Sequence, residues 1–518
     1  MKGYIKKYWR VLFILTAFIA FALNILRLHY TRAYNSDGVE LQNIVYFWQH
    51  SQHQLAYLGD DNFFFKIPFY LVYDHLGLSP RNTQLLTFAS FMFISFAALY
   101  YALVKLGKLF NWFREEYVAV GLVYLISLNR VYEYAMISNV RNIELGLIFL
   151  LILPAALGFK KQLNVGWWIL TGILLSLLIF SDPYFAYSIV LPLLALLAFN
   201  LWLDKKHRAT RAIPVVWLAL SAVLWKIWHA LLPRLKVRLV AIPAKFTALA
   251  TLASNIKFWS IALIALGGID YSAGIFHSVP WVFFVNLPLI VALMTYSLYL
   301  TITSLKNFKN DPWKTFMAAT PLIISGIYIL QPSDMTQEFR YLILAAFGFP
   351  ALIAFALNQF RFKWLIATVV IAVAVANTVR AGITVASGDL RPNLINYQLV
   401  ATVRNLGLDK GYTDYWNAGI NTYFSKKQIR FLQIACNSEH ELQPMYWLVD
   451  QGEYQAHANR TFYLFDNQAF YTKNCSPEQS MSQLGQPSQI VRIGSQYELA
   501  VYNYDIFTKL VNTQPNVR

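Results

Sequence analysis

Long runs of apolar residues recur through the first 380 residues of this 518-residue chain. Hydrophobic residues make up 57% of the chain and charged residues only 13%, whereas soluble domains carry roughly 25% charged residues. A helix of about 20 apolar residues can cross a bilayer, because it satisfies its backbone polar groups internally. We therefore predict a polytopic α-helical membrane protein. About eleven transmembrane helices are expected, at residues 11–26, 84–104, 117–128, 143–158, 166–181, 185–203, 212–230, 282–301, 315–331, 341–357 and 364–379.

The basic residues indicate how these helices are oriented. If the N-terminus lies in the cytoplasm, the short loops rich in Lys and Arg all fall on the cytoplasmic side, as the positive-inside rule requires. The first apolar segment is not followed by a small-residue cleavage site, so we expect a retained anchor rather than a signal peptide. The chain is therefore expected in the cytoplasmic (plasma) membrane, with everything after residue 380 outside. The loop residues are Lys105, Lys108, Arg114, Lys160, Lys161, Lys205, Lys206, Arg208, Arg211, Lys306, Lys309, Lys314, Arg361 and Lys363.

The composition becomes typical of a soluble domain near residue 380. This change divides the chain into a membrane domain at 1–380 and an extracytoplasmic domain at 381–518. The patterns of the second domain predict an α/β fold. We expect helices at 396–406 and near 411–416, strands at 429–435 and 460–466, a helix that begins at Ser476, and a hairpin between 489 and 504.

Both cysteines of the chain, Cys436 and Cys475, lie in the predicted outer domain. A single pair confined to an oxidising compartment predicts one disulfide. Two unrelated buried thiols are the alternative.

Two further segments of the membrane domain are expected on its outer side. Residues 27–83 form the first outer loop. Residues 234–260 alternate basic and apolar side chains, and the topology requires this stretch to begin and end outside. We therefore predict an interfacial amphipathic segment or a re-entrant element there.

Charged residues of the membrane domain gather at the outer ends of the predicted spans. Polar groups on one side favour a cavity open to that side, whereas a translocation path would place them at several depths. The basic excess on the outer face suggests an anionic lipid partner such as a phosphate head group, with ordinary snorkelling to lipid phosphates as the alternative. These outer-end residues are Arg130, Glu133, Arg141, Glu144, Asp182, Lys226, Asp270, Asp334, Glu338 and Arg340.

The first outer loop carries two pairs of acidic residues. Asp37 and Glu40 directly follow the first span, and Asp60 and Asp61 come about twenty residues later. Carboxylates beside a span are costly unless they line a polar cavity or take part in chemistry. The sequence has no nucleotide-binding Gly-rich loop, no H-E-x-x-H motif and no Cys/His cluster with metal-ligand spacing. Activated groups used on the outer face are therefore expected to be lipid-linked.

Three segments resemble the GT-C superfamily of integral-membrane glycosyltransferases. They are Asn35–Glu40 in the first loop, Asp60–Tyr70 with its Lys66-Ile67-Pro68-Phe69-Tyr70 end, and Gln337–Leu342 with Arg340 and Tyr341 at the entry to a late span. Many relatives have Pro two residues after the Tyr, whereas this chain has Ile343. Through the order of these segments and the topology, the resemblance covers nearly the whole chain.

The resemblance implies transfer of a sugar from a polyprenyl- or dolichyl-phosphate donor to an acceptor at the outer face, which is a glycan, a lipid or a protein. The acceptor hydroxyl needs a base as it attacks C1 of the sugar, and Asp37 would serve as this base. Arg340, with Arg141 and Lys226, would stabilise the charge of the departing phosphate, and Tyr341 belongs to the same binding segment.

The remaining acidic residues have supporting roles in this interpretation. Glu40 shares a face with Asp37 if the segment is helical, and would orient Asp37 or the acceptor. Asp60 and Asp61 would help to bind donor or acceptor, or would hold a divalent metal ion, as in some members of the superfamily. The expected partners are the lipid-linked donor, the acceptor and membrane lipids, and no nucleic acid.

The acidic residues also have purely structural alternatives. Asp37 could cap a helix that begins at Gly38, with Glu40 as the third residue of a capping box. Asp60 and Asp61 could form a turn before an amphipathic helix.

The basic residues, and the protein as a whole, have alternatives as well. Arg340 could form an ion pair with Glu338 or Asp334, and Lys226 could be an interfacial anchor. A transporter or flippase for lipid-linked glycans, and a non-catalytic membrane scaffold with an outer binding domain, are the other functions compatible with the pattern.

Overall fold

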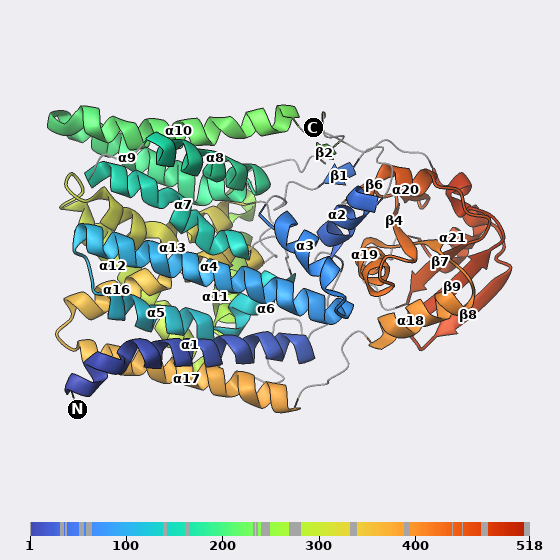
Figure 1. Ribbon diagram of the computed structural model, residues 1–518, viewed down its shortest axis with the longest axis horizontal. Helices are drawn as coiled ribbons and strands as arrows, with labels where there is room; N and C mark the ends of the chain where they lie inside the picture. Colours follow the sequence, from blue (N-terminus) through green and yellow to red (C-terminus); the bar gives the residue numbers. More distant parts are fainter. Residues whose placement is uncertain are drawn as a thin grey trace.

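The structure, a computed structural model, consists of a helical bundle joined to an α/β domain at one end (Figure 1). The described residues are 2–31, 36, 39–50, 56–58, 65–137, 142–160, 165–231, 234, 237–239, 249–268, 281–331, 339–387, 394–437, 439–447, 449–467 and 475–511. Asp37, Asp60, Asp61 and Arg141, all predicted site residues, lie outside these ranges.

Seven described helices are long and apolar enough to cross a membrane, and four more apolar helices are shorter. The protein is therefore an integral membrane protein, as predicted. The helices of the bundle are α1 (Lys2–Thr31), α4 (Pro80–Phe110), α5 (Glu115–Ser127), α6 (Asn129–Ile137), α7 (Ile143–Lys160), α8 (Val165–Ser181), the π-helical η3 (Ala186–Val190), α9 (Leu191–Leu203), α10 (Arg208–Leu231), α11 (Leu252–Leu266), α12 (Phe283–Leu305), α13 (Pro312–Leu330), the 3₁₀ turn η8 (Phe339–Leu342), α15 (Ile343–Phe347), α16 (Phe349–Gln359) and α17 (Lys363–Ser387). Every apolar run predicted from the sequence coincides with one to three of these elements.

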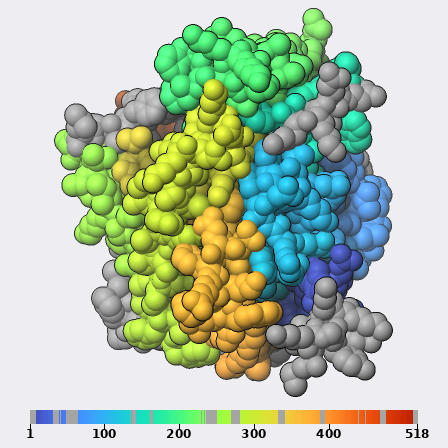
Figure 2. All heavy atoms as spheres, turned by 90° about the vertical axis from the view of Figure 1, so that its left-hand side faces the viewer, coloured from blue at the N-terminus to red at the C-terminus, as the bar shows by residue number. Residues whose placement is uncertain are grey.

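The loops predicted to be cytoplasmic meet at the end of the bundle that carries the N-terminus, opposite the α/β domain (Figure 1). Arg10 and Lys108 both pair with Glu115, at 3.5 and 3.2 Å. Asn200 and Arg211 both donate to the carbonyl of Lys309, which joins two further loops. Figure 2 looks onto this end, where α10 lies along the upper edge of the bundle.

Helix α11 lies near the domain-facing end of the bundle. At its start, Asn255 donates to the carbonyls of Ile329 and Gln331 at the end of α13. Just beyond its last residue, the carbonyl of Gly268 accepts from Arg380 near the end of α17. Both ends of α11 therefore bond to residues near the C-terminal ends of bundle helices, α13 and α17. Part of the predicted interfacial segment instead forms strand β2 (Val237–Leu239).

A six-stranded sheet in the order β5-β4-β3-β7-β9-β8 is the core of the C-terminal domain. Its strands β4, β3 and β7 are parallel, and the other three are antiparallel to their neighbours. The elements of this domain are α18 (Leu394–Asn405), β3 (Lys410–Thr413), α19 (Tyr415–Phe424), β4 (Arg430–Cys436), β5 (Leu442–Pro444), β6 (Val449–Asp450), α20 (Gln451–Gln455), β7 (Thr461–Asp466), α21 (Pro477–Leu484), β8 (Gln489–Ile493), β9 (Tyr497–Tyr502) and the 3₁₀ turn η10 (Ile506–Lys509).

The expected α/β fold and the capping box at Ser476 are confirmed. The helix predicted near 411–416 is wrong in its first half, because Lys410–Thr413 is a buried strand between β4 and β7. The helix begins only at Tyr415, after Asp414, whose side chain accepts from the backbone N–H groups of Trp416 and Asn417. Cys436, at the end of β4, is joined to Cys475 by a disulfide.

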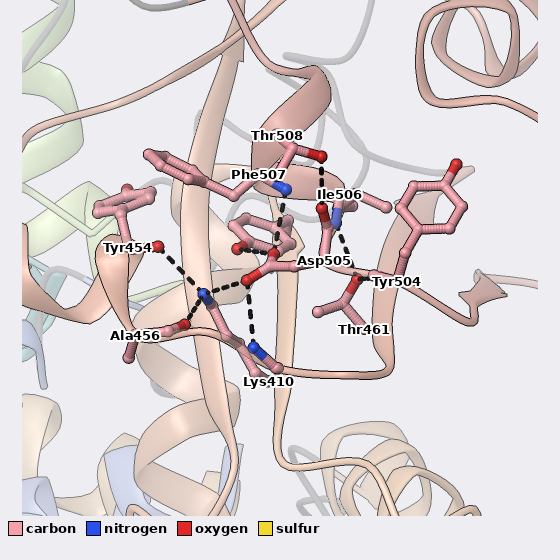
Figure 3. Close-up of polar contacts among 11 residues, drawn as sticks. Lys410, Tyr454, Ala456, Thr461, Tyr504, Asp505, Ile506, Phe507 and Thr508 are labelled. Carbon is pink, nitrogen blue, oxygen red and sulfur yellow. Dashed lines mark hydrogen bonds and ion pairs between the residues drawn. The ribbon is translucent and has the colours of Figure 1, made fainter.

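A buried ion pair fixes the end of the C-terminal sheet (Figure 3). The Nζ of Lys410 lies 3.0 Å from Oδ2 of Asp505 and donates to the carbonyls of Tyr454 and Ala456. The hydroxyl of Tyr412 donates to the other oxygen of Asp505 at 2.8 Å. All donors of the ammonium group are used within the fold, so this cluster is structural.

Helices α4 and α7 approach each other closely at Gly146. The backbone N–H of Gly146 donates to the hydroxyl of Ser95 at 2.9 Å, and a Cβ at this position would collide with the Ser95 carbonyl. We predict that Gly146→Ala lowers the thermal unfolding temperature of the detergent-solubilised protein, because backbone on α4 must move. Gly326→Ala on α13 is the matched control, since nothing lies within 4 Å of its Cβ position. Equal unfolding temperatures for the two variants would contradict this packing.

One buried carboxyl gives the C-terminal domain a pH dependence. Burial raises the pKa of Glu453 to about 8, although Arg430 opposes the shift. A group whose pKa is higher in the folded state stabilises the fold below its unfolded pKa, and this contribution is lost as the pH rises. We predict that the unfolding temperature falls between pH 6 and about pH 8, and that Glu453→Gln falls less. Parallel curves for the two proteins would show that Glu453 is not the responsible group.

Candidate active site

The first outer loop forms a short helix between the bundle and the C-terminal domain (Figure 1). This helix, α2 (Glu40–His50), is amphipathic, and its residues Ile44 and Val45 share an apolar cluster with Tyr70 and Phe91 at the domain-facing ends of α3 (Ile67–Tyr73) and α4. Its other face turns to the C-terminal domain. Helix α2 begins at Glu40, and not at Gly38 as the capping alternative for Asp37 assumed.

Glu40 is buried, with 5% of its surface exposed. Its Oε1 accepts a hydrogen bond from Nε2 of Gln433 on β4 at 2.7 Å. A short sheet joins the same regions, because β1 (Ala56–Leu58) pairs with β2 on one side and with β6 of the C-terminal domain on the other. The first loop is thus part of the interface between the two domains.

A fully buried cation lies below α2, at the N-terminus of α3. Lys66 is 0% exposed, and its Nζ lies 3.6 Å from Oε1 of Glu144, in the first turn of α7. Glu144 is also 0% exposed, and its Oε1 accepts no hydrogen bond from the described residues. Asp182, at the end of α8, lies close enough to Glu144 for their charges to interact. Lys66 is thus part of a buried cluster of charged side chains at this end of the bundle.

The predicted segment around Tyr341 lies near this charge cluster. The hydroxyl of Tyr184, two residues after Asp182, donates to the carbonyl of Tyr341 at 2.6 Å, and the two rings are 5.6 Å apart. Turn η8, which carries Arg340, contacts α6 and α11. The side chain of Arg340 lies outside the described residues.

A second cluster of charged side chains joins α1 to α6. Arg27, near the end of α1, forms an ion pair with Glu133, which also pairs with Arg130. All three side chains are at least nine-tenths buried. Among the described residues, two guanidinium groups thus share one buried carboxylate at this end of the bundle.

The structure brings some of the predicted site residues together and separates others. Glu40 and Tyr341 both lie at the domain-facing end, whereas Lys226 is exposed on α10, at the edge of the bundle. Neighbouring tryptophans of α10, Trp225 and Trp228, pack beside the apolar cluster of α2. Among the described residues no three His, Cys, Asp or Glu side chains form a possible metal site.

Lys66 lies in the segment Asp60–Tyr70, which resembles the GT-C superfamily, but the sequence pattern predicts no role for it. Two features of the sequence could have pointed to Lys66. It directly precedes a predicted helix, and the other charged residues of the membrane domain gather at the outer ends of the spans. Its pairing with Glu144 could not be predicted, because the two residues are far apart in the sequence and meet only through the packing of α3 on α4 and of α4 on α7.

Comparison with known proteins supports the expected fold. No protein-family model matches the chain, and no curated protein matches its sequence. Solved structures do match: ArnT from Cupriavidus metallidurans in the apo state is 10% identical, with a TM-score of 0.57 and coverage of 98% of this chain and 100% of that chain. The same protein bound to undecaprenyl phosphate is 9% identical, with a TM-score of 0.54 and coverage of 98% and 99%. The chain thus has an ArnT-like fold over nearly its whole length.

The Lys66–Glu144 pair can be tested by a double-mutant cycle. Removing one partner of a buried ion pair leaves an unpaired charge and costs about 3–5 kcal/mol, whereas apolar replacement of both is often tolerated. We predict that Lys66→Met lowers the unfolding temperature more than Lys66→Met combined with Glu144→Leu. Additive effects of the two substitutions would show that the side chains do not interact.

Proposed function

We propose that the protein is a glycosyltransferase that moves a sugar from a polyprenyl-phosphate-linked donor to an acceptor at the outer face of the cytoplasmic membrane. The main support is the fold, which matches ArnT over nearly the whole chain. One of the two matching structures is ArnT bound to undecaprenyl phosphate. A second support is the position of the buried charges, which gather at the end of the bundle beneath the C-terminal domain.

In the proposed reaction, the Asp37 carboxylate accepts the proton of the acceptor hydroxyl. The hydroxyl oxygen forms a bond to C1 of the sugar, and the bond between C1 and the phosphate oxygen breaks. The lipid phosphate leaves with the electron pair and gains negative charge. Cations fixed in a site of low dielectric constant stabilise that charge more strongly than water-exposed cations would.

Lys66 is the proposed principal cation for the donor phosphate, and Arg340 and Arg141 are proposed as further contributors. Because Lys66 is buried and paired with Glu144, its ammonium is already held in one place before the donor binds. Lys226 is less suited to this role, since it is exposed on the outer side of the bundle. Tyr341, packed on Tyr184, would contribute to the wall of the same site.

The orientation follows from the same proposal. The end that carries the N-terminus and the basic loops would face the cytoplasm, and the disulfide-bonded domain would face the oxidising side. A carboxylate, a lipid phosphate and an outer-face acceptor could then meet between the two domains. Asp60 and Asp61 would contribute to acceptor binding or to a metal site.

Replacing the proposed base should abolish the reaction. We predict that Asp37→Asn loses at least about 10²-fold in turnover, the lower range for positioned general bases, while its unfolding temperature is unchanged. The assay incubates the purified protein with undecaprenyl-phosphate-linked hexoses and pentoses and an envelope extract as acceptor, and measures release of undecaprenyl phosphate. Glu116→Gln, at the opposite end of the bundle, is the control. Wild-type turnover in Asp37→Asn would refute the base assignment, and lipid movement without sugar release would favour the transporter.

A further inference from the structure

We infer that the C-terminal domain positions the first outer segment for sugar transfer, and that Glu40 is a positioning residue through which it acts. This inference rests on the proposed function, because it takes Asp37 as the group whose place is set. It assigns to the C-terminal domain a direct part in the reaction rather than only a binding or covering role.

The first contact joins Glu40 to two elements of the C-terminal domain. Its carboxylate accepts from Gln433 at 2.7 Å, and its side chain packs directly on the Cα of Gly419 in α19. Any Cβ at position 419 would collide with this carboxylate. Glycine at this position therefore permits the close approach of α2 and α19, and a larger residue would displace Glu40.

The second contact lies on the other side of Asp37 in the sequence. The hydroxyl of Ser36 donates to the carbonyl of Trp416 at 2.8 Å and accepts from the backbone N–H of Ile420 at 3.2 Å. In a helix, a carbonyl and the N–H four residues later normally bond to each other. Ser36 thus inserts its hydroxyl into the hydrogen-bond ladder of α19, and this residue is fully buried.

The third contact extends the same face of α2. Asn43 lies one turn after Glu40, and its Nδ2 donates to the carbonyl of Gly419 at 2.9 Å. One turn further, the ring of Phe47 lies under the guanidinium of Arg430, 4.8 Å from its centroid. Residues 40, 43 and 47 follow the spacing of one helical face. This face of α2 therefore packs against the C-terminal domain.

Helix α19 is itself held by the bundle. The hydroxyl of Tyr423 donates to the carbonyl of Pro80 at the start of α4, at 3.1 Å. Lys427, just after α19, forms a 2.6 Å ion pair with Asp74, which follows α3. Helix α19 and the turn after it are therefore bonded to the bundle at the start of α4 and just after α3. A movement of α19 would also displace Ser36 and Glu40, which contact it directly.

These contacts hold Ser36 and Glu40, the two residues that flank the interval 37–39 in the sequence. Both flanking side chains are buried, and the backbone N–H of Val39 donates to the carbonyl of Ser36 at 2.9 Å. Asp37 is in this short interval. A displacement of about 1 Å of a reacting group can cost about 10²-fold in rate. The position of Glu40 in the interface, and not proton transfer by its carboxylate, is thus its contribution.

The test compares substitutions that keep or remove the contact. Glu40→Gln keeps an acceptor oxygen for Gln433 and should keep kcat within about threefold, whereas Glu40→Ala and Gly419→Ala should lower kcat by roughly 10- to 100-fold. The KM for the undecaprenyl-phosphate donor should stay constant, because the proposed phosphate site is in the bundle. Gln433→Leu should also lower kcat, and Gln489→Leu on the exposed edge strand β8 is its matched control.

Thermal unfolding of each purified variant separates local displacement from loss of folding, and Ser36→Ala supplies a milder change at the second contact. Glu40→Gln as inactive as Asp37→Asn would show that the Glu40 carboxylate acts chemically, and would overturn the positioning role. Wild-type kcat in both Gly419→Ala and Gln433→Leu would overturn the role of the domain. Full activity of Asp37→Asn would instead overturn the proposed function, so the two failures are distinguishable.

Discussion

The packing of α2 against α19 is the contact on which the arrangement of the site depends. Helix α2 of the first outer loop lies between the two larger bodies of the protein. Ile44 and Val45 provide its contact with the bundle, and Glu40 and Asn43 provide its contact with the C-terminal domain. Without Gly419, the polar contact could not form at this distance.

The charges of the bundle follow from the cost of burying ions. An isolated ion in a low-dielectric interior would cost several kcal/mol, and the two charge clusters described in the bundle at the domain-facing end contain ion pairs. Lys66 is paired with Glu144, and Arg27 and Arg130 share Glu133. Such a pair holds its cation rigidly, and in the proposed reaction this would suit Lys66 to bind a phosphate whose charge increases. The same restriction keeps the middle of the described spans largely apolar.

The membrane fold could be predicted from the sequence because bilayer crossing leaves a strong signal in hydrophobicity. The ends of the helices were harder to predict. Helix α4 begins at Pro80, where Ser79 caps it, and α17 continues past the predicted end because Asn377 bonds to Asn286 and Arg380 to Gly268. The sequence pattern predicts a helix over part of strand β3. This short stretch of chain forms a strand by pairing with β4 and β7, which are distant in the sequence.

The candidate site could be predicted only in part, because its partners come from distant parts of the chain. Glu40 was singled out from its place near Asp37, but its bond to Gln433 spans most of the chain and has no local signal. The most direct measurement of the account uses undecaprenyl phosphate with a photoreactive group beside the phosphate, cross-linked to the protein and mapped by mass spectrometry. If the donor phosphate binds at the domain-facing end of the bundle, we expect labelled peptides around Lys66 and Tyr341. Labels confined to the basic loops at the N-terminal end would contradict it.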